Sequence, residues 1–322
     1  MAILVYAESW NGIFKKASYE AVSYASQLAE KLGVNLIALT IANKDNPDIL
    51  AMYGASRVIT IADESMQTFS NQAYANAISQ VADKEGVDII VVSNTNNGKS
   101  LSPILSVKRK SCLISNVIGL PSSLEPFVLK TKAFSSKAFV NYNIENKNKI
   151  ISITPNSVGI TENKKIAETE KFEYVATDSD NRLISLSIKK SSGKILLTEA
   201  DMVVSAGRGL KGPENWGMVE ELAGLLGAAT ACSKPVSDIG WRSHSEHVGQ
   251  TGIAINPQLY IAIGISGAIQ HLAGVNASKN IVVINTDPDA PFFKAADYGI
   301  VGDAFEVVPK LIDALKSYQT NN

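Results

Sequence analysis

Two glycine-rich segments of the sequence have the residue types that surround a bound phosphate group. The first, Gly207-Arg-Gly-Leu-Lys-Gly212, has the spacing G-x-G-x-x-G and follows the apolar run Met202–Ala206. Glycines at this spacing let a backbone turn approach a pyrophosphate at the start of a helix. However, Pro213 stands where the helix should start, and no acidic residue follows at the distance that holds a ribose hydroxyl. Two interpretations stay open: glycines that serve the geometry of the turn alone, or a turn that holds Arg208 and Lys211 beside an anion.

The second segment, Gly264-Ile-Ser-Gly-Ala-Ile-Gln-His-Leu-Ala-Gly274, joins a hydrophobic strand directly to small residues that begin a helix. Small residues at 266–268 leave their backbone N–H groups unobstructed at the helix N-terminus. Free donors and the helix dipole both favour a phosphate there. Gln270 and His271 follow within the first turn, so we expect them beside the bound group.

A long polar segment, Ser233–Gly252, precedes this strand. Loops of such length inside a compact domain are usually functional or mobile. Pro235 favours an extended conformation at Lys234. His244 and His247 are three residues apart, but no third metal ligand is evident, so we expect both to be solvated loop residues.

Two polar residues near the end of the chain stand where open α/β sheets bind ligands. Asn285 ends the apolar run Ile281–Ile284, and ligands bind outside the carboxyl ends of such strands. Asp303 precedes the last predicted helix and has the residue type of an N-cap. Capping and a hydrogen bond to ribose or adenine explain Asp303 equally well, so both roles stay open.

A second α/β unit that opens near residue 190 must position these residues. Its predicted strands are Met202–Ala206, Leu259–Ile265 and Ile281–Ile284, and its predicted helices are Glu214–Leu226, Gly267–Leu272 and Phe305–Tyr318.

The first part of the chain alternates apolar strands with helices, which is typical of βαβ units and a parallel sheet. Predicted strands cover residues 2–7, 34–42, 56–62 and 87–92, and predicted helices cover 16–32, 71–85 and 98–106. Residues 125–190 predict antiparallel strands, at 134–142 and 150–154, and then a polar link at 177–182. We therefore expect an α/β fold of two domains, 1–190 and 191–322, each a mainly parallel sheet flanked by helices.

The composition excludes several classes of function. Among 322 residues, 30 basic and 31 acidic side chains give a net charge of −1, so nucleic acid and anionic membranes are not expected partners. Two cysteines and three histidines support neither a disulfide framework nor a metal centre. The N-terminus lacks the positive region of a signal peptide, and no window approaches the roughly 18 apolar residues of a membrane span. We expect a soluble cytoplasmic protein without a metal, and no nucleophile–base pair or paired carboxylates mark a catalytic residue.

Four segments resemble the FAD domain of electron-transfer flavoprotein alpha subunits. They are VSAGRGL at 204–210, VGQTG at 248–252, LYIAIGISGAIQHLAG at 259–274 and INTDPDAP…ADYGIVGD at 284–303. The resemblance covers nearly all of residues 195–315, and GISGAIQHLAG is highly specific. The N-terminal domain is compatible with the family by its length and its βαβ pattern.

The resemblance implies an FAD site with defined roles. Residues 266–271 would bind the pyrophosphate and approach the flavin, with His271 near the pyrimidine end of the ring system. Gln250 and Thr251 would lie over the reactive middle of the ring, with the Thr251 hydroxyl within reach of N5. Arg208 would hold phosphate or flavin from the opposite strand tip.

Further roles follow from the same resemblance. Ser233 would contact the ring system, and Asn285 and Asp303 the adenosine part. Lys234 stands where the family commonly has an arginine, so the positive charge is kept and the planar guanidinium is lost. The effect of this exchange on the flavin potential stays open. The implied cofactor-binding residues are Arg208, Ser233, Lys234, Val248, Gly249, Gln250, Thr251, Ser266, Gly267, Ala268, Ile269, Gln270, His271, Asn285, Asp303 and Ala304.

The resemblance also implies an electron carrier, the alpha subunit of a heterodimer. It would accept electrons from flavin dehydrogenases of the acyl-CoA dehydrogenase type, as in fatty acid β-oxidation. It would pass them to a membrane quinone oxidoreductase or another redox partner. A smaller beta subunit would complete the flavin site and carry AMP, or a second FAD in bifurcating members. The structural N-terminal domain would face the partner. Two alternatives stay open: a flavin- or NAD-dependent oxidoreductase with its own small-molecule substrate, and a nucleotide-binding scaffold without redox function.

Overall fold

The computed structural model describes residues 2–134, 136–180 and 195–321. Its contacts divide the chain into two compact units. The first comprises Met1–Ala133 and Phe139–Lys190, and the second comprises Phe134–Ala138 and Ser191–Asn322. None of the described helices combines the length and the hydrophobicity of a membrane span.

The first unit is built on a sheet with the strand order β10-β9-β7-β11-β6-β1-β4-β5-β12, in which β8 also pairs with β9. The strands are β1 Ala2–Tyr6, β4 Asn35–Ile41, β5 Arg57–Ile61, β6 Ile89–Ser93, β7 Cys112–Val117, β8 Ser123–Leu124, β9 Phe127–Ala133, β10 Ala138–Asn143, β11 Lys149–Ile153 and β12 Glu168–Lys171. A separate two-stranded ribbon joins β2 Ser9–Trp10 to β3 Ile13–Phe14.

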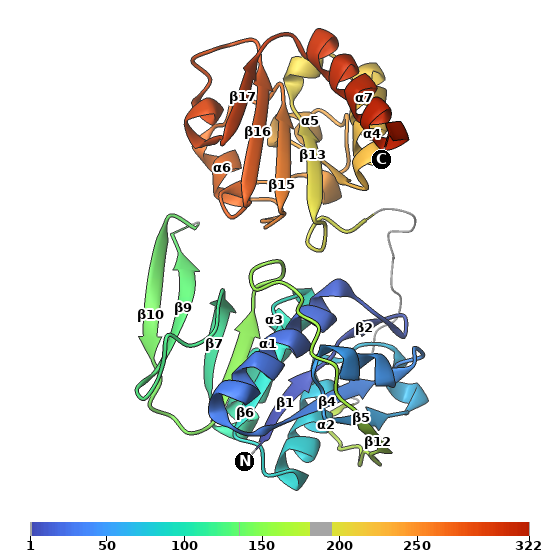
Figure 1. Ribbon diagram of the computed structural model, residues 1–322, viewed down its shortest axis with the longest axis vertical. Helices are drawn as coiled ribbons and strands as arrows, with labels where there is room; N and C mark the ends of the chain where they lie inside the picture. Colours follow the sequence, from blue (N-terminus) through green and yellow to red (C-terminus); the bar gives the residue numbers. More distant parts are fainter. Residues whose placement is uncertain (1, 135, 181–194, 322) are drawn as a thin grey trace. The chain divides into compact units, whose positions relative to one another are not determined.

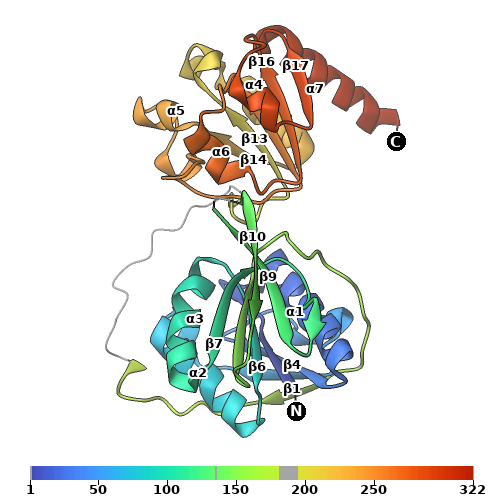
Figure 2. The ribbon, with the colours of Figure 1, turned by 90° about the vertical axis from the view of Figure 1, so that its left-hand side faces the viewer.

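Helices cover both faces of this sheet. They are α1 Lys16–Leu32, α2 Asn71–Lys84 and α3 Asn96–Arg109, with 3₁₀ turns η1 Pro47–Tyr53 and η2 Glu64–Gln67. Alternate residues of β1 enter opposite cores, because Ile3 and Val5 pack with α1 while Leu4 and Tyr6 pack with α2 and α3. Figure 2 shows α1 on one side of the sheet and α2 and α3 on the other.

The predicted antiparallel completion of this unit is only partly right. β7 and β8 are antiparallel to β9. In contrast, β11 lies parallel between β6 and β7, and β12, which the sequence does not predict, lies parallel to β5. The residues of β11 from Ile150 to Ile153 are buried on both faces, which is typical of a central parallel strand. The strand predicted at 134–142 begins only at Ala138, because Phe134 and Ser136 have the positive φ angles of a turn. The end of the predicted polar link and the predicted start of the second unit, at 181–182 and 190, lie outside the described residues.

The second unit is a five-stranded parallel sheet in the order β14-β13-β15-β16-β17. Its strands are β13 Met202–Ala206, β14 Ala229–Cys232, β15 Leu259–Ile263, β16 Asn280–Asn285 and β17 Tyr298–Val301. Its helices are α4 Gly217–Leu226, α5 Lys234–Asp238, α6 Ile269–Val275 and α7 Ala304–Asn321. Short 3₁₀ turns are η4 Arg208–Leu210, η5 Pro213–Trp216, η6 His244–Glu246 and η7 Pro291–Ala295.

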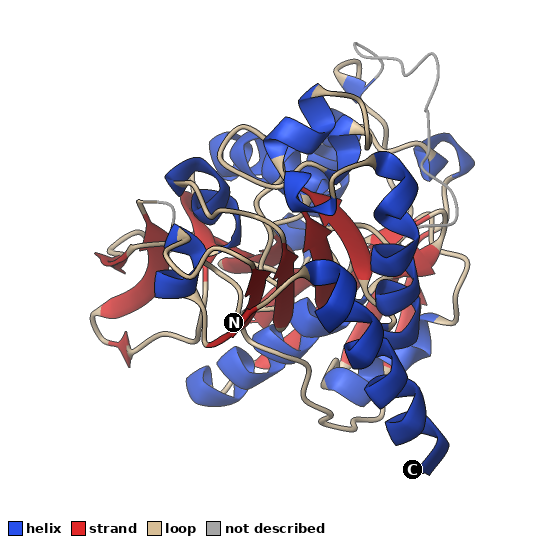
Figure 3. Ribbon diagram, turned by 90° about the horizontal axis from the view of Figure 1, so that it is seen from above, coloured by secondary structure: helices blue, strands red, loops and turns tan. Residues whose placement is uncertain are grey.

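Two cores lie on opposite faces of this second sheet. One joins the sheet to α4 and α7, which Figure 1 shows side by side, and the other joins it to α6 and η7. Figure 3 shows α7 as the helix that runs to the C-terminus. The chain leaves β13 for β14 on one side and returns to β15 on the other, so the strand order reverses between β13 and β15. In open parallel sheets, the crevice at such a reversal is where ligands bind.

The α/β class with mainly parallel sheets is confirmed, and several element boundaries differ from prediction. The helix predicted from Glu214 begins at Gly217, because the 3₁₀ turn η5 starts at Pro213. β14, β17 and α5 are not predicted from the sequence. β14 consists of Ala-Thr-Ala-Cys, whose small side chains carry little strand signal.

Candidate functional site

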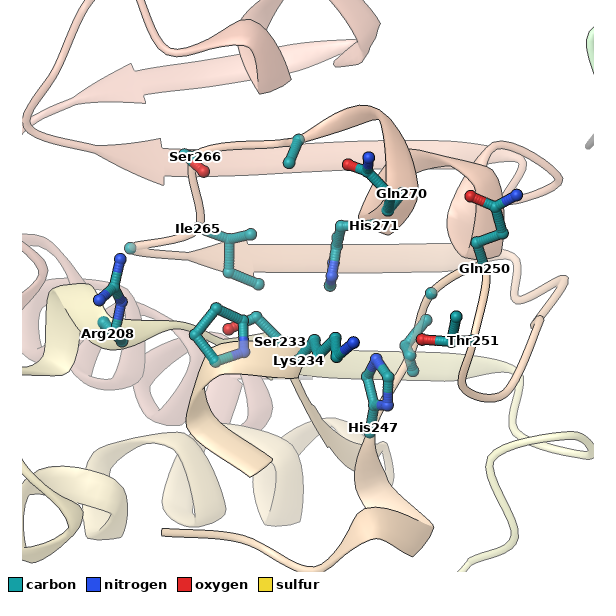
Figure 4. Close-up of a pocket in the computed structure, with 15 residues that line it drawn as sticks. Arg208, Ser233, Lys234, His247, Gln250, Thr251, Ile265, Ser266, Gln270 and His271 are labelled. Atoms are coloured by element: carbon teal, nitrogen blue, oxygen red, sulfur yellow. The ribbon is translucent and has the colours of Figure 1, made fainter. Parts of the chain in front are cut away.

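A cavity of about 470 Å³ opens at the carboxyl ends of β13, β14 and β15. Its volume lies within the roughly 300–1,000 Å³ of small-molecule sites. Figure 4 shows side chains from α5, α6 and the connecting turns pointing into it. The lining residues are Arg208, Ser233, Lys234, Pro235, His247, Val248, Gly249, Gln250, Thr251, Gly264, Ile265, Ser266, Ala268, Gln270 and His271.

Glycines at the ends of β13 and β15 allow two backbone segments to approach closely at one side of the cavity. The Gly209 N–H donates to the Gly264 carbonyl at 3.1 Å. A Cβ at Gly209 would lie 2.6 Å from the Gly264 Cα, and a Cβ at Gly264 would lie 2.7 Å from the Gly209 Cα. Close backbone approach therefore accounts for this part of the G-x-G-x-x-G motif. Arg208, between two of the glycines, still lines the cavity.

A second glycine contact fixes the turn that carries Gln250 and Thr251. The Gln250 N–H donates to the Gln270 carbonyl on α6 at 2.7 Å. A Cβ at Gly274 would lie 2.5 Å from the backbone nitrogen of Gly249, so only a glycine allows this approach. The turn and the first residues of α6 are thereby held at the same cavity.

The loop between β15 and α6 presents a row of unpaired backbone donors. The N–H groups of residues 266–270 make no hydrogen bond to another described residue. Gly267 has a φ of 80°, and a Cβ there would lie 2.5 Å from Phe292, so the loop folds tightly against η7. Ala268 occupies the N-cap position of α6. Unpaired donors of this kind bind anions.

Two cations complete this side of the cavity. Arg208 and Lys234 are exposed, and neither forms an ion pair with another residue of the described ranges. Lys234 is not extended as predicted: it is the first residue of α5. Pro235 is tolerated at the second position of that helix, because an N–H in the first turn has no helical partner in any case.

His271 is held by an aromatic cluster beneath α6. Its Nε2 lies 2.8 Å from the Tyr260 hydroxyl, and its ring lies edge-on to Phe292 with centroids 5.7 Å apart. Burial lowers the pKa of His271 to about 4, the neighbouring His247 adds to the lowering, and the Val248 backbone opposes it. The Nδ1 atom is buried without a hydrogen bond of ordinary geometry to the described chain. The ring is thus neutral at pH 7, with one nitrogen left for a ligand.

His247 is a site residue that the sequence analysis misses. The sequence predicts that both His244 and His247 are solvated. His244 is exposed as predicted, but the His247 side chain is 6% exposed and lines the cavity. Glycine explains its burial, because a Cβ at Gly252 would lie 2.8 Å from the His247 Nδ1. Burial, Lys234 and His244 lower the pKa of His247, while Asp238 raises it. The periodic pattern of the sequence carries no signal for a loop side chain that turns inward.

Five of the predicted cofactor residues do not line the cavity: Gly267, Ile269, Asn285, Asp303 and Ala304. The Asn285 amide donates to the carbonyl of Ile265, a cavity residue, at 3.0 Å. Asp303 caps α7 by accepting from the Phe305 N–H at 2.9 Å, and it pairs with Lys211 at 3.4 Å. Of the two predicted roles of Asp303, capping of the helix is therefore confirmed. Its contact with a ligand stays a prediction. No cluster of three potential metal ligands occurs among the described residues.

Comparison with known proteins shows which family the chain matches. Residues 196–276 match the family model described as the electron transfer flavoprotein FAD-binding domain, and residues 3–179 match the electron transfer flavoprotein domain. All residues that line the cavity fall within the first match. The electron transfer flavoprotein subunit alpha of Thermoanaerobacterium thermosaccharolyticum is 37% identical, over 98% of this chain and 97% of the relative. That of Bacillus subtilis is 35% identical, over 98% and 97%. A protein named FixB from Clostridium saccharobutylicum is 33% identical, over 98% and 96%.

Proposed function

Because this chain belongs to the electron transfer flavoprotein alpha-subunit family, we propose that it is an electron carrier that holds one FAD in the cavity of its second unit. The observation that carries the proposal is the convergence of unpaired donors, two cations and a neutral imidazole at the carboxyl ends of β13–β15. That is the position where open parallel sheets bind nucleotide-containing ligands.

The residues present fit two parts of this cofactor, the pyrophosphate and the flavin ring. A pyrophosphate needs donors and positive charge, which the N–H groups of 266–270 and the Arg208 guanidinium supply. A flavin ring needs a flat slot with donors at its polar edge, and Thr251, Lys234 and His271 surround the remaining space. When bound, FAD supplies the redox chemistry, taking up and releasing electrons.

The side chains around the ring set how readily an electron is accepted. Lys234 places a positive charge at the cavity and forms no ion pair with another described residue. A unit charge about 4 Å from a developing negative charge is worth roughly 4 kcal/mol at an effective dielectric constant of about 20, before desolvation. His271 contributes a neutral group, because burial keeps its ring uncharged.

The proposal extends to partners. A beta subunit would complete the ring site and carry AMP or a second FAD. Flavin dehydrogenases would supply the electrons, and a quinone oxidoreductase or another redox protein would accept them. The N-terminal domain would face the partner. Asn285 and Asp303 would contact the adenosine part, and Ala304 would contact the cofactor. The free thiols of Cys112 and Cys232 agree with a reducing cytoplasm.

Purification together with a beta subunit tests the proposal. We expect a yellow complex that releases one FAD per alpha chain and shuttles electrons between a flavin dehydrogenase and an acceptor dye. It should not turn over a small substrate by itself. A colourless complex would contradict the proposal and favour a nucleotide-binding scaffold. Substrate-dependent turnover by the chain alone would favour the oxidoreductase alternative.

A further inference from the structure

The hydroxyl that holds His271 belongs to a residue outside the cavity. Tyr260 lies on β15, is 0% exposed, and is not among the lining residues. Its hydroxyl oxygen is 2.8 Å from the His271 Nε2. Phe292 stacks on Tyr260, with ring centroids 6.2 Å apart, and meets His271 edge-on. The imidazole is thus fixed in orientation by a buried phenol and a buried ring.

The environment decides which of the two groups donates this hydrogen bond. Burial raises the pKa of the Tyr260 phenol, so the hydroxyl keeps its proton. The side chain of Ser205 lies beside it and opposes this rise, but its hydroxyl forms no well-shaped hydrogen bond within the described chain. Among the described residues, the His271 Nε2 is the acceptor in ordinary hydrogen-bond geometry with the phenol, whereas the Ser205 hydroxyl contacts it in poorer geometry. A neutral imidazole carries one proton, so donation to Nε2 leaves that proton on Nδ1.

The Nδ1 atom is the other ring nitrogen. It is buried and makes no hydrogen bond of ordinary geometry with the described residues, although a contact with the Val248 backbone raises the pKa of the ring. Figure 4 shows the ring directed from α6 into the cavity. A buried donor that lacks a well-formed hydrogen bond is costly, so a ligand that offers a carbonyl oxygen there is favoured.

We propose that Tyr260 is a positioning residue, whose hydroxyl holds His271 in the tautomer that presents an Nδ1–H donor to a carbonyl of the bound flavin ring. The inference rests on the proposed function for the identity of the ligand. The tautomer itself is a property of the chain alone. A phenylalanine at position 260 would keep the ring packing and release the imidazole to exchange its proton between Nδ1 and Nε2.

The first test measures the tautomer directly. In ¹⁵N-histidine-labelled protein, with and without FAD, the His271 signals should show a protonated Nδ1 and an unprotonated Nε2. Tyr260→Phe should mix the two tautomers. A proton on Nε2 in the wild-type chain would overturn the proposal, whether or not FAD binds and whether or not the variant folds.

The second test measures the consequence in the FAD-loaded complex. Tyr260→Phe should lower the equilibrium constant for uptake of the first electron about tenfold, which is a fall of about 59 mV in that potential. The same substitution in a His271→Gln background should add no further shift, because the two residues act as one unit. The matched control is Tyr24→Phe, which removes a buried phenol of the first unit that bonds to the Gly119 carbonyl at 3.3 Å.

The outcomes distinguish the positioning role of Tyr260 from the binding of FAD. A Tyr260→Phe complex with full FAD content, an unchanged tautomer and an unchanged potential would refute the positioning role while the carrier function stands. A wild-type complex that binds no FAD would refute the proposed function, and the tautomer measured in the flavin-free chain would still decide the role of Tyr260.

Discussion

Positive charge at the cavity comes from Arg208 and Lys234, which form no ion pair with another described residue. Lys234 is also, after burial, among the groups that lower the pKa of His247. In contrast, Lys211, three residues after Arg208, is paired with Asp303. The family resemblance draws attention to position 234, where lysine replaces the common arginine, and only the structure shows that Lys234 forms no ion pair with a described residue.

Removing the charge at Lys234 should make the flavin harder to reduce. We expect Lys234→Ala to retain FAD and to lower the first one-electron reduction potential by tens of millivolts, since about 1.4 kcal/mol corresponds to about 59 mV. A spectroscopic titration against reference dyes measures the shift. Lys279→Ala, at an exposed lysine outside the cavity, is the control. An unchanged potential in a flavin-loaded Lys234→Ala complex would exclude Lys234 from the tuning of the flavin.

The buried imidazole of His271 should make the chain sensitive to acid. Its folded-state pKa of about 4 lies below the ordinary value of 6.5, so the unfolded chain binds the additional proton between these values. The neutral ring of His271 contributes on the order of 3 kcal/mol to the free energy of unfolding. This contribution is fully present above pH 6.5 and is lost as the pH falls toward 4. Urea unfolding of the flavin-free chain at pH 7 and pH 4.5 measures it. His271→Gln should reduce the fall in unfolding free energy, and an equal fall in both proteins would refute the assignment.

Contacts between elements depend on glycines whose role the sequence does not reveal. The turn at 249–252 lies against α6 because Gly249 and Gly274 meet backbone to backbone. A G-x-G-x-x-G pattern is visible in the sequence, yet the motif glycines Gly207 and Gly209 mainly serve close approach to Gly264. Spacing alone cannot distinguish approach to a ligand from approach to another strand.

Adding a side chain at one of these contacts should separate the 249–252 turn from helix α6. Gly274→Ala would place a Cβ 2.5 Å from the backbone nitrogen of Gly249, and backbone atoms cannot yield as a flexible side chain can. We expect a loss of about 1–3 kcal/mol in unfolding free energy and at least about tenfold weaker FAD binding. The matched control is Gly224→Ala in helix α4, where no atom lies within 4 Å of the new Cβ. That variant should be as stable as the wild type or more so. Equal behaviour of the two variants would show that the contact does not hold the turn.

Elements with strong periodic patterns are predicted well, and elements defined by their neighbours are not. Strands such as Met202–Ala206 and the helix Lys16–Leu32 agree with prediction because their apolar residues repeat at the period of the element. The direction of β11 is wrong because a short apolar run does not reveal which strands flank it. The helix α5 is missed because Pro235 and polar residues mask its single turn.

At the scale of the whole molecule, strand order determines where the chemistry lies. The second sheet reverses its order between β13 and β15, which brings residues 208, 233–235, 247–251, 264–266, 268, 270 and 271 to one cavity. Eleven of the sixteen predicted cofactor residues lie there, because the motifs that mark them end strands or begin helices. His247 and Tyr260 escape prediction, because their roles depend on which side chains the fold buries beside His271.

An equilibrium titration of the flavin-free complex with FAD measures whether this cavity binds the cofactor. The wild type should bind one FAD per chain. The double variant Arg208→Glu/Lys234→Glu reverses both cavity cations without touching the core, and its affinity should be at least about tenfold weaker, a loss of about 1.4 kcal/mol or more. Lys279→Glu/Lys310→Glu makes the same change in net charge outside the cavity and should bind as the wild type does. FAD binding that the cavity variant leaves unchanged would contradict the account.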